Sequence, residues 1–375
     1  MRSTMPPAQA PDDGPLAGDG ASRLLSYLRT TFDQPRLSYA EEPARLVGGN
    51  ETFIYSLRLQ GATDELSGPL ILRAYRAGYA RPGQARFESA VQNALAGLGY
   101  PAARVFVAAP DAEVLGTPFI IMGRLPGTLL LQGIGELDES GKMRFDQSRG
   151  LLRHIGLLRE IPRICADAQV RLHALDPQPL LDAIDREGLP RSSVTVEGRL
   201  DTVRDYIEAA GLDGLRDAFA WLLANEPAPE RLAVCHGDTQ PNNLLMTGKT
   251  ITGVVDWSQV MVGDPALDVG CTKMALETVP LELPRFLQWL ARPIAWRVSH
   301  NYMRSYLKEG RVRPEAVAYF GILRALFALA GIGARRAAGT SEPDVWDNPA
   351  GVRNLIARVR SVTGIEVHLP EDQRR

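Results

Sequence analysis

The chain has 375 residues, of which 45% are hydrophobic and 23% are charged, and these are ordinary values for soluble globular proteins. Its 42 Lys and Arg against 44 Asp and Glu leave a net charge of −2. This balance argues against a nucleic-acid-binding protein, which neutralises phosphates with a basic face. The three cysteines, Cys165, Cys235 and Cys271, are widely spaced, which argues against a disulfide scaffold or a cysteine-based zinc site and favours a reducing cytosol.

No membrane or export signal is evident. The first twenty residues lack an apolar run and are rich in Pro, Gly, Ala and Asp, which predicts a disordered tail. The longest apolar stretch, residues 319–334, is interrupted by Arg324 and falls short of the ~20 residues that span a bilayer. We therefore expect a buried helix there, no membrane contact and a cytoplasmic protein.

Hydrophobic periodicity predicts mainly antiparallel strands and one inserted helix in the N-terminal third. After a helix over residues 22–32, the expected elements are strands at 52–59 and 69–75, a helix at 84–98, and strands at 103–108 and 118–122. Beyond Gly123 the pattern is mostly helical. The expected helices lie at 151–175 with a break at Pro162, at 200–210, at 212–223, and from 265 to the end.

A short strand-rich island interrupts the helical part, with strands at 232–235, 243–246 and 250–255. Gly248 lies between the last two, which suggests a hairpin. The predicted fold class is therefore α+β, with a small antiparallel β-sheet lobe and a larger, mostly α-helical lobe. We place the boundaries at 1–20 for the tail, 21–123 for the N-terminal lobe and 124–375 for the C-terminal lobe.

The island contains the segment His236-Gly237-Asp238-Thr239-Gln240-Pro241-Asn242-Asn243, called here the HGD loop (residues 236–243). Asp238 and Asn243 open the hairpin, and Asp256 closes it. Phosphoryl transfer needs one carboxylate to orient and deprotonate the acceptor hydroxyl, while an amide oxygen and a second carboxylate hold Mg²⁺ on the phosphates. Asp238 fits the first role, and Asn243 and Asp256 fit the second, because a hairpin brings its two ends together.

The pattern HGDxxxxN followed by a strand ending in Asp resembles the aminoglycoside phosphotransferase family, the small-molecule branch of the protein-kinase-like fold. The GDPxxD sequence of residues 263–268 continues this resemblance, which covers roughly residues 40–340. The resemblance implies a bilobal protein-kinase-like fold with a nucleotide-binding N-terminal lobe. It also implies transfer of the γ-phosphoryl group of ATP or GTP to a hydroxyl of a small molecule, with Mg²⁺ as cofactor.

The resemblance also implies a nucleotide site in the N-terminal lobe. Gly48 and Gly49 match the glycine loop over the phosphates, Arg73 and Glu88 match the paired basic and acidic residues, and Met122 matches the strand into the hinge. The sequence departs from the kinase pattern in four places. Arg73 stands for the usual Lys, Trp257 and Ser258 replace the Phe and Gly of the metal loop, and Thr52 stands where relatives often have Asn.

The remaining polar and aromatic residues are expected to be structural. His236 should bond to the loop backbone, Asp264 should cap the helix starting at Pro265, Asp268 should brace the HGD loop, and His173 should pack. The cysteines are expected in the core. Four aromatic residues are also expected to pack in the core, and the minority interpretation is that they line an acceptor pocket. This set is Trp289, Trp296, Tyr302 and Tyr306.

Basic residues outnumber acidic ones over residues 273–315, which argues against a polycationic aminoglycoside as acceptor. A neutral, monocationic or anionic hydroxyl compound is expected. Two other function classes stay open: a nucleotide-binding regulatory protein without turnover, and a metal-dependent hydrolase using Asp238 and His236. The sequence leaves the acceptor, the choice of ATP or GTP, and the oligomeric state open.

Overall fold

The computed structural model describes residues 14–46, 52–76, 82–130, 135–137, 143–145, 151–278, 288–339 and 346–370. Contacts divide the chain into two compact units. The first comprises Met1–Asn93 and Ala103–Arg124, and the second comprises Ala94–Ala102 and Leu125–Arg375. Residues 94–102 belong to the second unit because the Tyr100 hydroxyl donates to the Ala168 carbonyl (3.0 Å) and the Val254 N–H donates to the Pro101 carbonyl (2.7 Å).

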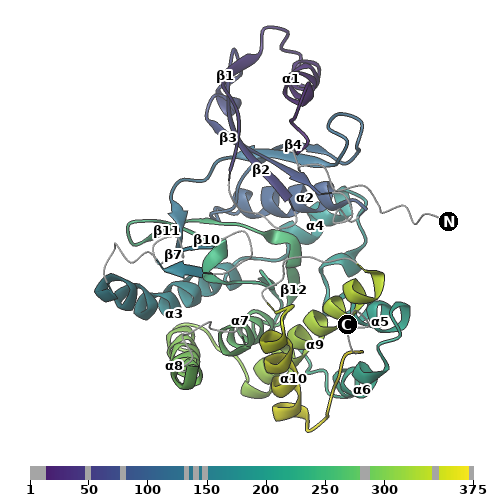
Figure 1. Ribbon diagram of the computed structural model, residues 1–375. Helices are drawn as coiled ribbons and strands as arrows, with labels where there is room; N and C mark the ends of the chain where they lie inside the picture. Colours follow the sequence, from purple (N-terminus) through teal and green to yellow (C-terminus); the bar gives the residue numbers. More distant parts are fainter. Residues whose placement is uncertain are drawn as a thin grey trace, which may run out of the picture. The chain divides into compact units, whose positions relative to one another are not determined.

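The first unit contains a five-stranded antiparallel sheet in the order β1-β2-β3-β5-β4 (Figure 1). Its elements are α1 (Gly20–Thr31), β1 (Ser38–Arg45), β2 (Thr52–Gln60), β3 (Pro69–Tyr75), α2 (Gln84–Gly97) up to Asn93, β4 (Val105–Ala109) and β5 (Phe119–Gly123). The alternating apolar residues of β2 are buried as predicted, and Leu24 and Leu28 of α1 belong to the same core.

The prediction missed β1. This edge strand has the sequence SYAEEPAR, none of whose residues is buried, and its pairing with β2 is interrupted by register shifts. An apolar alternation that would reveal a strand is therefore absent, because exposed edge strands carry polar residues.

The second unit is mainly helical. Its helices are α3 (Leu151–His173), α4 (Gln178–Arg186), α5 (Val196–Ala209), α6 (Arg216–Ala224), α7 (Ala266–Thr278), α8 (Gln288–Tyr306), α9 (Pro314–Ala338) and α10 (Pro349–Thr363). Its short strands are β6 (Thr128–Leu129), β7 (Gly135–Leu137), β8 (Met143–Phe145), β9 (Ala233–Cys235), β10 (Leu244–Thr247), β11 (Thr250–Val254) and β12 (Met261–Gly263).

The strands around the HGD loop form two small antiparallel sheets. β10 and β11 make the predicted hairpin, with Gly248 in the turn at φ 61°, and β6 adds to it on the other side of β10. β9 pairs with β12, a three-residue strand that the prediction missed. The HGD loop therefore leaves one sheet at Cys235 and enters the other at Leu244.

The predicted break at Pro162 is wrong, because α3 runs continuously through it. Proline lacks the N–H that an interior helical position donates, which usually kinks or ends a helix. Here the residues that follow, among them Ile164, Cys165 and Ala168, are buried. Packing of this face compensates for the missing hydrogen bond.

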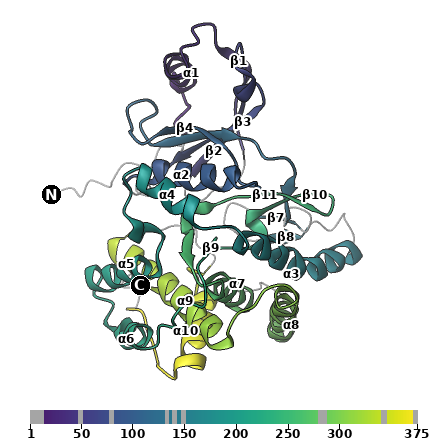
Figure 2. The same ribbon diagram turned by 180° about the vertical axis from the view of Figure 1, so that it is seen from behind.

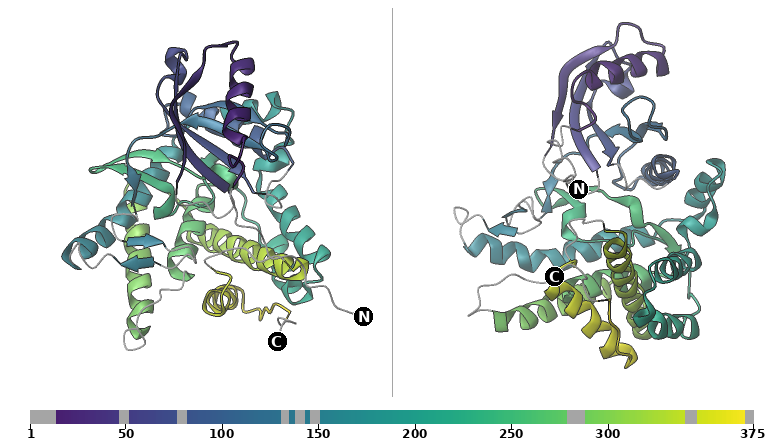
Figure 3. Two further views of the ribbon diagram at one scale, coloured as in Figure 1. Left: turned by 45° about the horizontal axis from the view of Figure 1, so that its top comes forward. Right: turned by 45° about the vertical axis from the view of Figure 1, so that its right-hand side comes forward.

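Helix α9 forms the centre of the second unit. Figure 2 shows it beside α7 and α10, and the left view of Figure 3 shows it along its length in yellow-green. By length and composition α9 is apolar enough to cross a membrane, but 78% of its apolar window is buried inside the structure. The predicted buried helix is thus confirmed. α7 approaches α9 closely at Gly270, where a Cβ atom would lie 2.6 Å from the Val317 carbonyl oxygen.

Candidate active site

The ring of His236 holds the backbone of the HGD loop. Its Nε2–H donates to the Val255 carbonyl at 3.0 Å, and its Nδ1 accepts the N–H of Asp238 at 3.3 Å. Because a carbonyl only accepts and an amide N–H only donates, these contacts fix the tautomer of the imidazole. The predicted structural role of His236 is confirmed, and the ring links the start of the loop to the end of β11.

Trp257 stands where kinases have Phe, and it packs on this histidine. The two rings lie 4.5 Å apart, and the indole N–H donates to the Val254 carbonyl at 3.0 Å. The side chain is fully buried. The larger aromatic ring is thus accommodated without an unsatisfied donor.

At Gly237 a residue with a side chain would be strained and would overlap its neighbours. Its φ is 77°, and a Cβ atom would overlap the carbonyl oxygen of Gln259. Glycine adopts this left-handed conformation without strain. The chain can therefore turn directly between His236 and Asp238.

The carboxylate of Asp238 is partly buried and surrounded by donors. Its Oδ2 accepts from the side-chain amide of Gln240 at 2.9 Å and from that of Asn243 at 3.4 Å. Its Oδ1 lies 3.3 Å from a guanidinium nitrogen of Arg324, on α9. The carboxylate is thereby held in one orientation, which a group that must meet a substrate hydroxyl requires.

The structure brings Asn243 and Asp256 to the same end of the hairpin. The N–H of Val255, the residue before Asp256, donates to the Asn243 carbonyl at 3.0 Å. The side-chain amide of Asn243 also donates to the Asp238 carbonyl at 2.9 Å. Asp256 has φ 66°, an uncommon conformation for a non-glycine residue that recurs at functional sites.

Oxygen donors at this end suit a hard divalent cation. The Asn243 amide nitrogen is engaged with the Asp238 carbonyl, which directs the amide oxygen of the same group elsewhere. Together with the Asp256 carboxylate it offers the neutral and anionic oxygens that Mg²⁺ prefers. The residues therefore fit the predicted metal.

Asp268 braces the HGD loop from α7, as predicted. Its Oδ1 accepts the N–H of Gly237 at 2.6 Å, and its Oδ2 accepts the N–H of His236 at 2.8 Å. The His173 ring lies 3.1 Å from Oδ2. Burial alone would raise the pKa of Asp268, but its hydrogen bond to His173, its electrostatic interactions with His173 and His236, and the N–H of the loop together lower this pKa below its ordinary value.

His173 does more than pack. Its second ring nitrogen contacts the Tyr306 hydroxyl at 2.8 Å. A neighbouring chain of bonds runs from Tyr302 to Gln169, from Gln169 to Thr272 (2.9 Å), and from Thr272 to the Thr239 carbonyl (2.8 Å). These buried polar groups tie α3, α7 and α8 to the loop.

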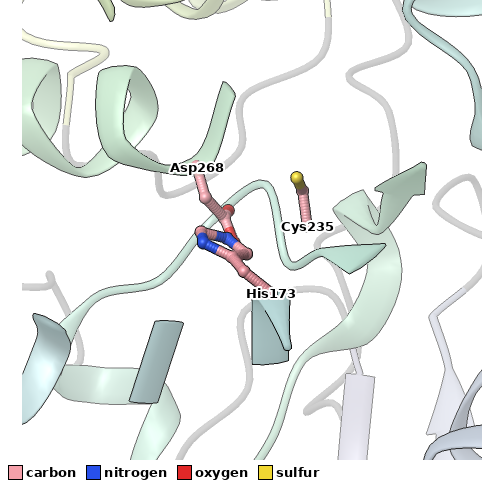
Figure 4. A group of neighbouring side chains, drawn as sticks. All are labelled: His173, Cys235 and Asp268. Carbon is pink, nitrogen blue, oxygen red and sulfur yellow. The ribbon is translucent and has the colours of Figure 1, made fainter. Parts of the chain in front are cut away.

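Within the described residues His173, Cys235 and Asp268 form a cluster that resembles a metal site (Figure 4). Hydrogen bonds account for it instead. Both nitrogens of His173 are engaged, and Asp268 already accepts from two backbone N–H groups. Burial raises the pKa of the Cys235 thiol well above its ordinary value, so the thiolate that would bind a metal is disfavoured.

Asp264 caps α7. Its Oδ1 accepts the N–H of Ala266 at 2.8 Å, and its Oδ2 accepts the N–H of Glu230 at 2.9 Å. The predicted capping role is confirmed. The second bond also anchors the segment before β9.

In the first unit Arg73 and Glu88 form the predicted pair, with 2.7 Å between Nη1 and Oε2. Glu88 is fully buried and also accepts from Gln84 at 2.9 Å, while Arg73 Nε lies 3.4 Å from the Thr52 hydroxyl. Met122 lies on β5. Gly48 and Gly49 lie outside the described residues, so the glycine loop stays a prediction.

The expected aromatic core is half wrong. Tyr302 and Tyr306 are fully buried, but Trp289 and Trp296 are 71% and 60% exposed. At about 100° per residue, the seven residues from Trp289 to Trp296 lead back to the same face of the helix. The six residues from Trp296 to Tyr302 lead to another face. The two pairs therefore lie on different faces of α8. All three cysteines are buried and free, as predicted.

Sequence reasoning missed Arg324 and Gln240 as neighbours of Asp238. Arg324 did carry a signal, since it is the one charged residue in the apolar stretch 319–334. A charge in a buried helix needs a partner. Nothing in the sequence indicated which partner, because 86 residues separate Arg324 from Asp238.

A family model described as the phosphotransferase enzyme family, APH, matches residues 58–299. The mouse (Mus musculus) protein acyl-CoA dehydrogenase family member 10 is 24% identical over 213 residues, which are 55% of this chain and 18% of that protein. The chain thus spans about a fifth of the length of this curated relative.

Solved structures share the fold. One is a protein assigned as an aminoglycoside phosphotransferase from Ralstonia eutropha JMP134, with a TM-score of 0.57 and 18% identity over 92% of this chain and 99% of that one. A thermostable mutant of aminoglycoside phosphotransferase APH(4)-Ia, in a ternary complex with ADP and hygromycin B, has a TM-score of 0.52 and 17% identity over 91% and 99%. Macrolide 2'-phosphotransferase MphH from Brachybacterium faecium has a TM-score of 0.50 and 18% identity over 94% and 100%.

These similarities confirm the predicted family resemblance and its protein-kinase-like fold. They also confirm the expected enzyme class. The chain belongs to the phosphotransferase enzyme family APH, whose small-molecule kinases transfer phosphoryl groups to hydroxyls.

Proposed function

We propose that this protein transfers the γ-phosphoryl group of ATP or GTP to a hydroxyl of a small molecule. The observation that carries the proposal is the convergence of Asp238, Asn243 and Asp256 at one end of the β10–β11 hairpin. A relative of the same fold has been crystallised with ADP, which supports a nucleotide co-substrate. The protein is proposed to act in the cytoplasm, without nucleic acid or membrane as partner.

Asp238 is the proposed base. It orients the acceptor hydroxyl and accepts its proton as the oxygen attacks the γ-phosphorus, while the nucleoside diphosphate leaves. Gln240 and Asn243 hold Oδ2 of this carboxylate, which limits its rotation. Positioning of this kind is the main contribution that a protein makes to phosphoryl transfer.

Asn243 and Asp256 are the proposed Mg²⁺ ligands. Bound there, Mg²⁺ would neutralise charge on the phosphates. In the first unit, Arg73 is proposed to contact the α- and β-phosphates, and buried Glu88 fixes its guanidinium. Gly48 and Gly49 are proposed to cover the phosphates, and the strand end at Met122 to meet the base.

The test is an ADP-release assay with ATP, and a GDP-release assay with GTP, over hydroxyl-bearing metabolites and antibiotics. Formation of the phosphorylated product should be verified by mass spectrometry. The Asp238→Asn variant should lose about 10²–10⁴-fold in kcat yet bind Mg²⁺-nucleotide as the wild type does. The Asp256→Ala variant should bind Mg²⁺-nucleotide more weakly.

A matched control is Asp185→Asn, which removes a carboxylate from an exposed pair with Arg191 and should leave turnover unchanged. Retention of more than about a tenth of kcat in Asp238→Asn would contradict the base role. Mg²⁺-nucleotide binding without transfer to any compound would indicate the regulatory alternative instead.

A further inference from the structure

Two fully buried tyrosines of α8, Tyr302 and Tyr306, each begin a series of hydrogen bonds that ends on the HGD loop. One series ends on the two N–H groups that precede Asp238, and the other ends on the carbonyl of Thr239. The proposed base therefore lies between the two ends. Every residue of both series belongs to the second unit.

The first series, called here the Tyr306 relay, consists of Tyr306, His173 and Asp268. The Tyr306 hydroxyl lies 2.8 Å from His173 Nδ1, and His173 Nε2 lies 3.1 Å from Asp268 Oδ2. Figure 4 shows the imidazole beside the carboxylate. An ionised carboxylate only accepts, so Nε2 carries the proton, and in the neutral ring Nδ1 accepts from the Tyr306 hydroxyl. Tyr306 thus stabilises the tautomer that directs an N–H at Asp268.

The second series, called here the Tyr302 relay, consists of Tyr302, Gln169 and Thr272. The Thr272 hydroxyl donates to the Thr239 carbonyl at 2.8 Å, and the Gln169 side-chain nitrogen donates to the Thr272 oxygen at 2.9 Å. The amide oxygen of Gln169 accepts from the Tyr302 hydroxyl. Because a carbonyl only accepts, every donor in this relay is directed from α8 towards the loop.

The Tyr302 hydroxyl therefore determines which way the Gln169 amide faces. Without this donor, the amide oxygen would gain a partner only by turning towards Thr272. The Thr272 hydroxyl would then donate to Gln169 in place of the Thr239 carbonyl. Loss of one hydroxyl on α8 would in this way release the backbone directly after Asp238.

Burial makes both relays sensitive to the loss of a single group. None of the six side chains is more than 2% exposed, so water cannot readily replace a missing partner. Burial also raises the pKa of Tyr302 and of Tyr306 above its ordinary value, so both hydroxyls keep the proton that they donate. In such an interior, a hydrogen-bond network contributes as a unit.

The two relays hold the peptide groups on both sides of Asp238. Asp268 Oδ1 accepts the N–H of Gly237 at 2.6 Å, and Thr272 donates to the carbonyl of Thr239 at 2.8 Å. The backbone that carries the Asp238 side chain is thereby fixed from two directions. Phosphoryl transfer depends mainly on positioning, so a shift of this backbone should reduce the rate.

We propose that Tyr302 and Tyr306 are positioning residues for phosphoryl transfer, and that each acts on the HGD loop through its own relay. The inference rests on the proposed role of Asp238 as base. Neither tyrosine contacts the reacting groups in this scheme, so both affect kcat through the position of the carboxylate. A merely structural role would instead reduce the amount of folded enzyme and every activity alike.

The first experiment compares Tyr302→Phe and Tyr306→Phe with the wild type, using Mg²⁺-ATP and the best acceptor found in the ADP-release screen. Each substitution should lower kcat by about 10- to 100-fold and change Mg²⁺-ATP binding little. The concentration of folded enzyme is taken from the stoichiometry of Mg²⁺-ATP binding.

Tyr319→Phe is the matched control. Tyr319 lies on α9 and is also buried, and its hydroxyl makes no hydrogen bond within the described part of the chain. This variant should have the kcat of the wild type. Losses of kcat in the two α8 variants that do not exceed that of Tyr319→Phe would overturn the proposal.

The second experiment repeats both substitutions in the Asp238→Asn variant. Once the proton-accepting carboxylate is removed, its position matters much less, so a further Tyr→Phe change should lower the residual kcat only slightly. Equal fold losses in the two backgrounds would show that the tyrosines do not act through Asp238, and would overturn the positioning role.

The third experiment tests the hydroxyl in the middle of the Tyr302 relay. Thr272→Val retains the shape of the side chain without the donor, whereas Thr272→Ser retains the donor. We expect Thr272→Val to lower kcat as Tyr302→Phe does, and Thr272→Ser to stay near the wild type. Equal losses in both would assign the effect to packing and overturn this relay. The pair also keeps the test decisive if the tyrosine variants fail to fold.

Failure of this inference is distinguishable from failure of the proposed function. Full activity of Asp238→Asn would contradict the base role, and absence of transfer by the wild type to any compound would contradict the proposed function. The inference would be wrong in both cases. Wild-type kcat in the tyrosine and Thr272→Val variants, with an inactive Asp238→Asn, would overturn the inference alone.

Discussion

A single carboxylate, that of Asp268, accepts hydrogen bonds from two consecutive N–H groups of the HGD loop. The same group contacts His173 and is fully buried. A buried charge with these partners contributes to stability only while all of them are present. At the scale of residues, Asp268 thus determines the conformation of the HGD loop as much as Asp238 does.

The pKa of Asp268 is lowered in the folded state, relative to about 3.9 in an unfolded chain. Its contribution to the free energy of unfolding is therefore fully present above about pH 4, and it is lost as the pH falls through the lower, folded value. We expect Asp268→Asn to cost about 3–5 kcal/mol at pH 7. The difference in the free energy of unfolding between this variant and the wild type should become smaller as the pH falls below 4, measured by urea unfolding.

Asp213→Asn serves as control, because it removes an exposed partner of Arg216. This change should cost less than about 1 kcal/mol. If the free energies of unfolding of Asp268→Asn and the wild type differ by the same amount at every pH, the ionised carboxylate is not what stabilises the loop.

Arg73 and Glu88 should be energetically coupled. Their side chains are 13% and 0% exposed and 2.7 Å apart, so removal of one deprives the other of this ion pair. We expect Arg73→Ala to raise the nucleotide KM and lower kcat, and Glu88→Gln to do so more mildly. A double-mutant cycle in nucleotide binding should give about 0.5–3 kcal/mol of coupling.

The exposed pair Arg104 and Glu65, 3.2 Å apart in the same unit, provides the comparison. The same substitutions there should give less than about 1 kcal/mol of coupling. Additive effects at Arg73 and Glu88 would mean that Glu88 does not orient the arginine.

At the scale of elements, the sequence predicted what periodicity and turn residues encode. The alternation of β2, the hairpin at Gly248 and the long apolar helix α9 are all present. It did not predict β12, whose three residues are too few to show a period, or the continuity of α3 at Pro162. Those features depend on pairing and packing with segments far away in the chain.

The candidate site follows the same division. Asp238, Asn243 and Asp256 were predictable because their spacing lies within one hairpin. Arg324 was not, since only the packing of α9 brings it to the HGD loop. Local motifs specify the groups proposed for the chemistry, and long-range contacts specify what surrounds them.

The close approach of α7 and α9 should be sensitive to a single methyl group. At Gly270 a Cβ atom would lie 2.6 Å from the Val317 carbonyl oxygen and 2.8 Å from the Gly321 nitrogen, and backbone atoms cannot rotate away. We expect Gly270→Ala to reduce the free energy of unfolding by about 1–3 kcal/mol, measured by urea or thermal unfolding.

Gly331→Ala is the matched substitution within α9. A Cβ atom there would be 3.5 Å from an Arg335 side-chain nitrogen and 3.9 Å from the Tyr206 ring, which are ordinary contacts. It should be neutral or stabilising by up to about 1 kcal/mol. Equal effects of both substitutions would show that α7 can move away from α9.

At the scale of the whole molecule, charge is the property that bears on the acceptor. The net charge is −2, and basic residues outnumber acidic ones over residues 273–315. Recognition of several ammonium groups requires an anionic site. The chain therefore differs in charge from what a polycationic substrate needs, although one relative of the same fold was crystallised with hygromycin B.

We expect kanamycin, a polycation, to be a poor acceptor, with kcat/KM below about 10⁴ M⁻¹s⁻¹. The measurement is ADP release at moderate ionic strength, with the best acceptor found in the ADP-release screen as positive control. Phosphorylation of kanamycin above that value would contradict this prediction.

One consequence of α9 concerns how this enzyme could evolve. The helix buries an apolar face in the second unit and also carries Arg324 beside Asp238. Because Asp238 is the proposed base, substitutions of Arg324 that change its surroundings would have to arise inside a packed interior, where most changes of volume are destabilising. Laboratory selection for another acceptor should accordingly enrich compensating stabilising mutations before, or together with, changes at position 324.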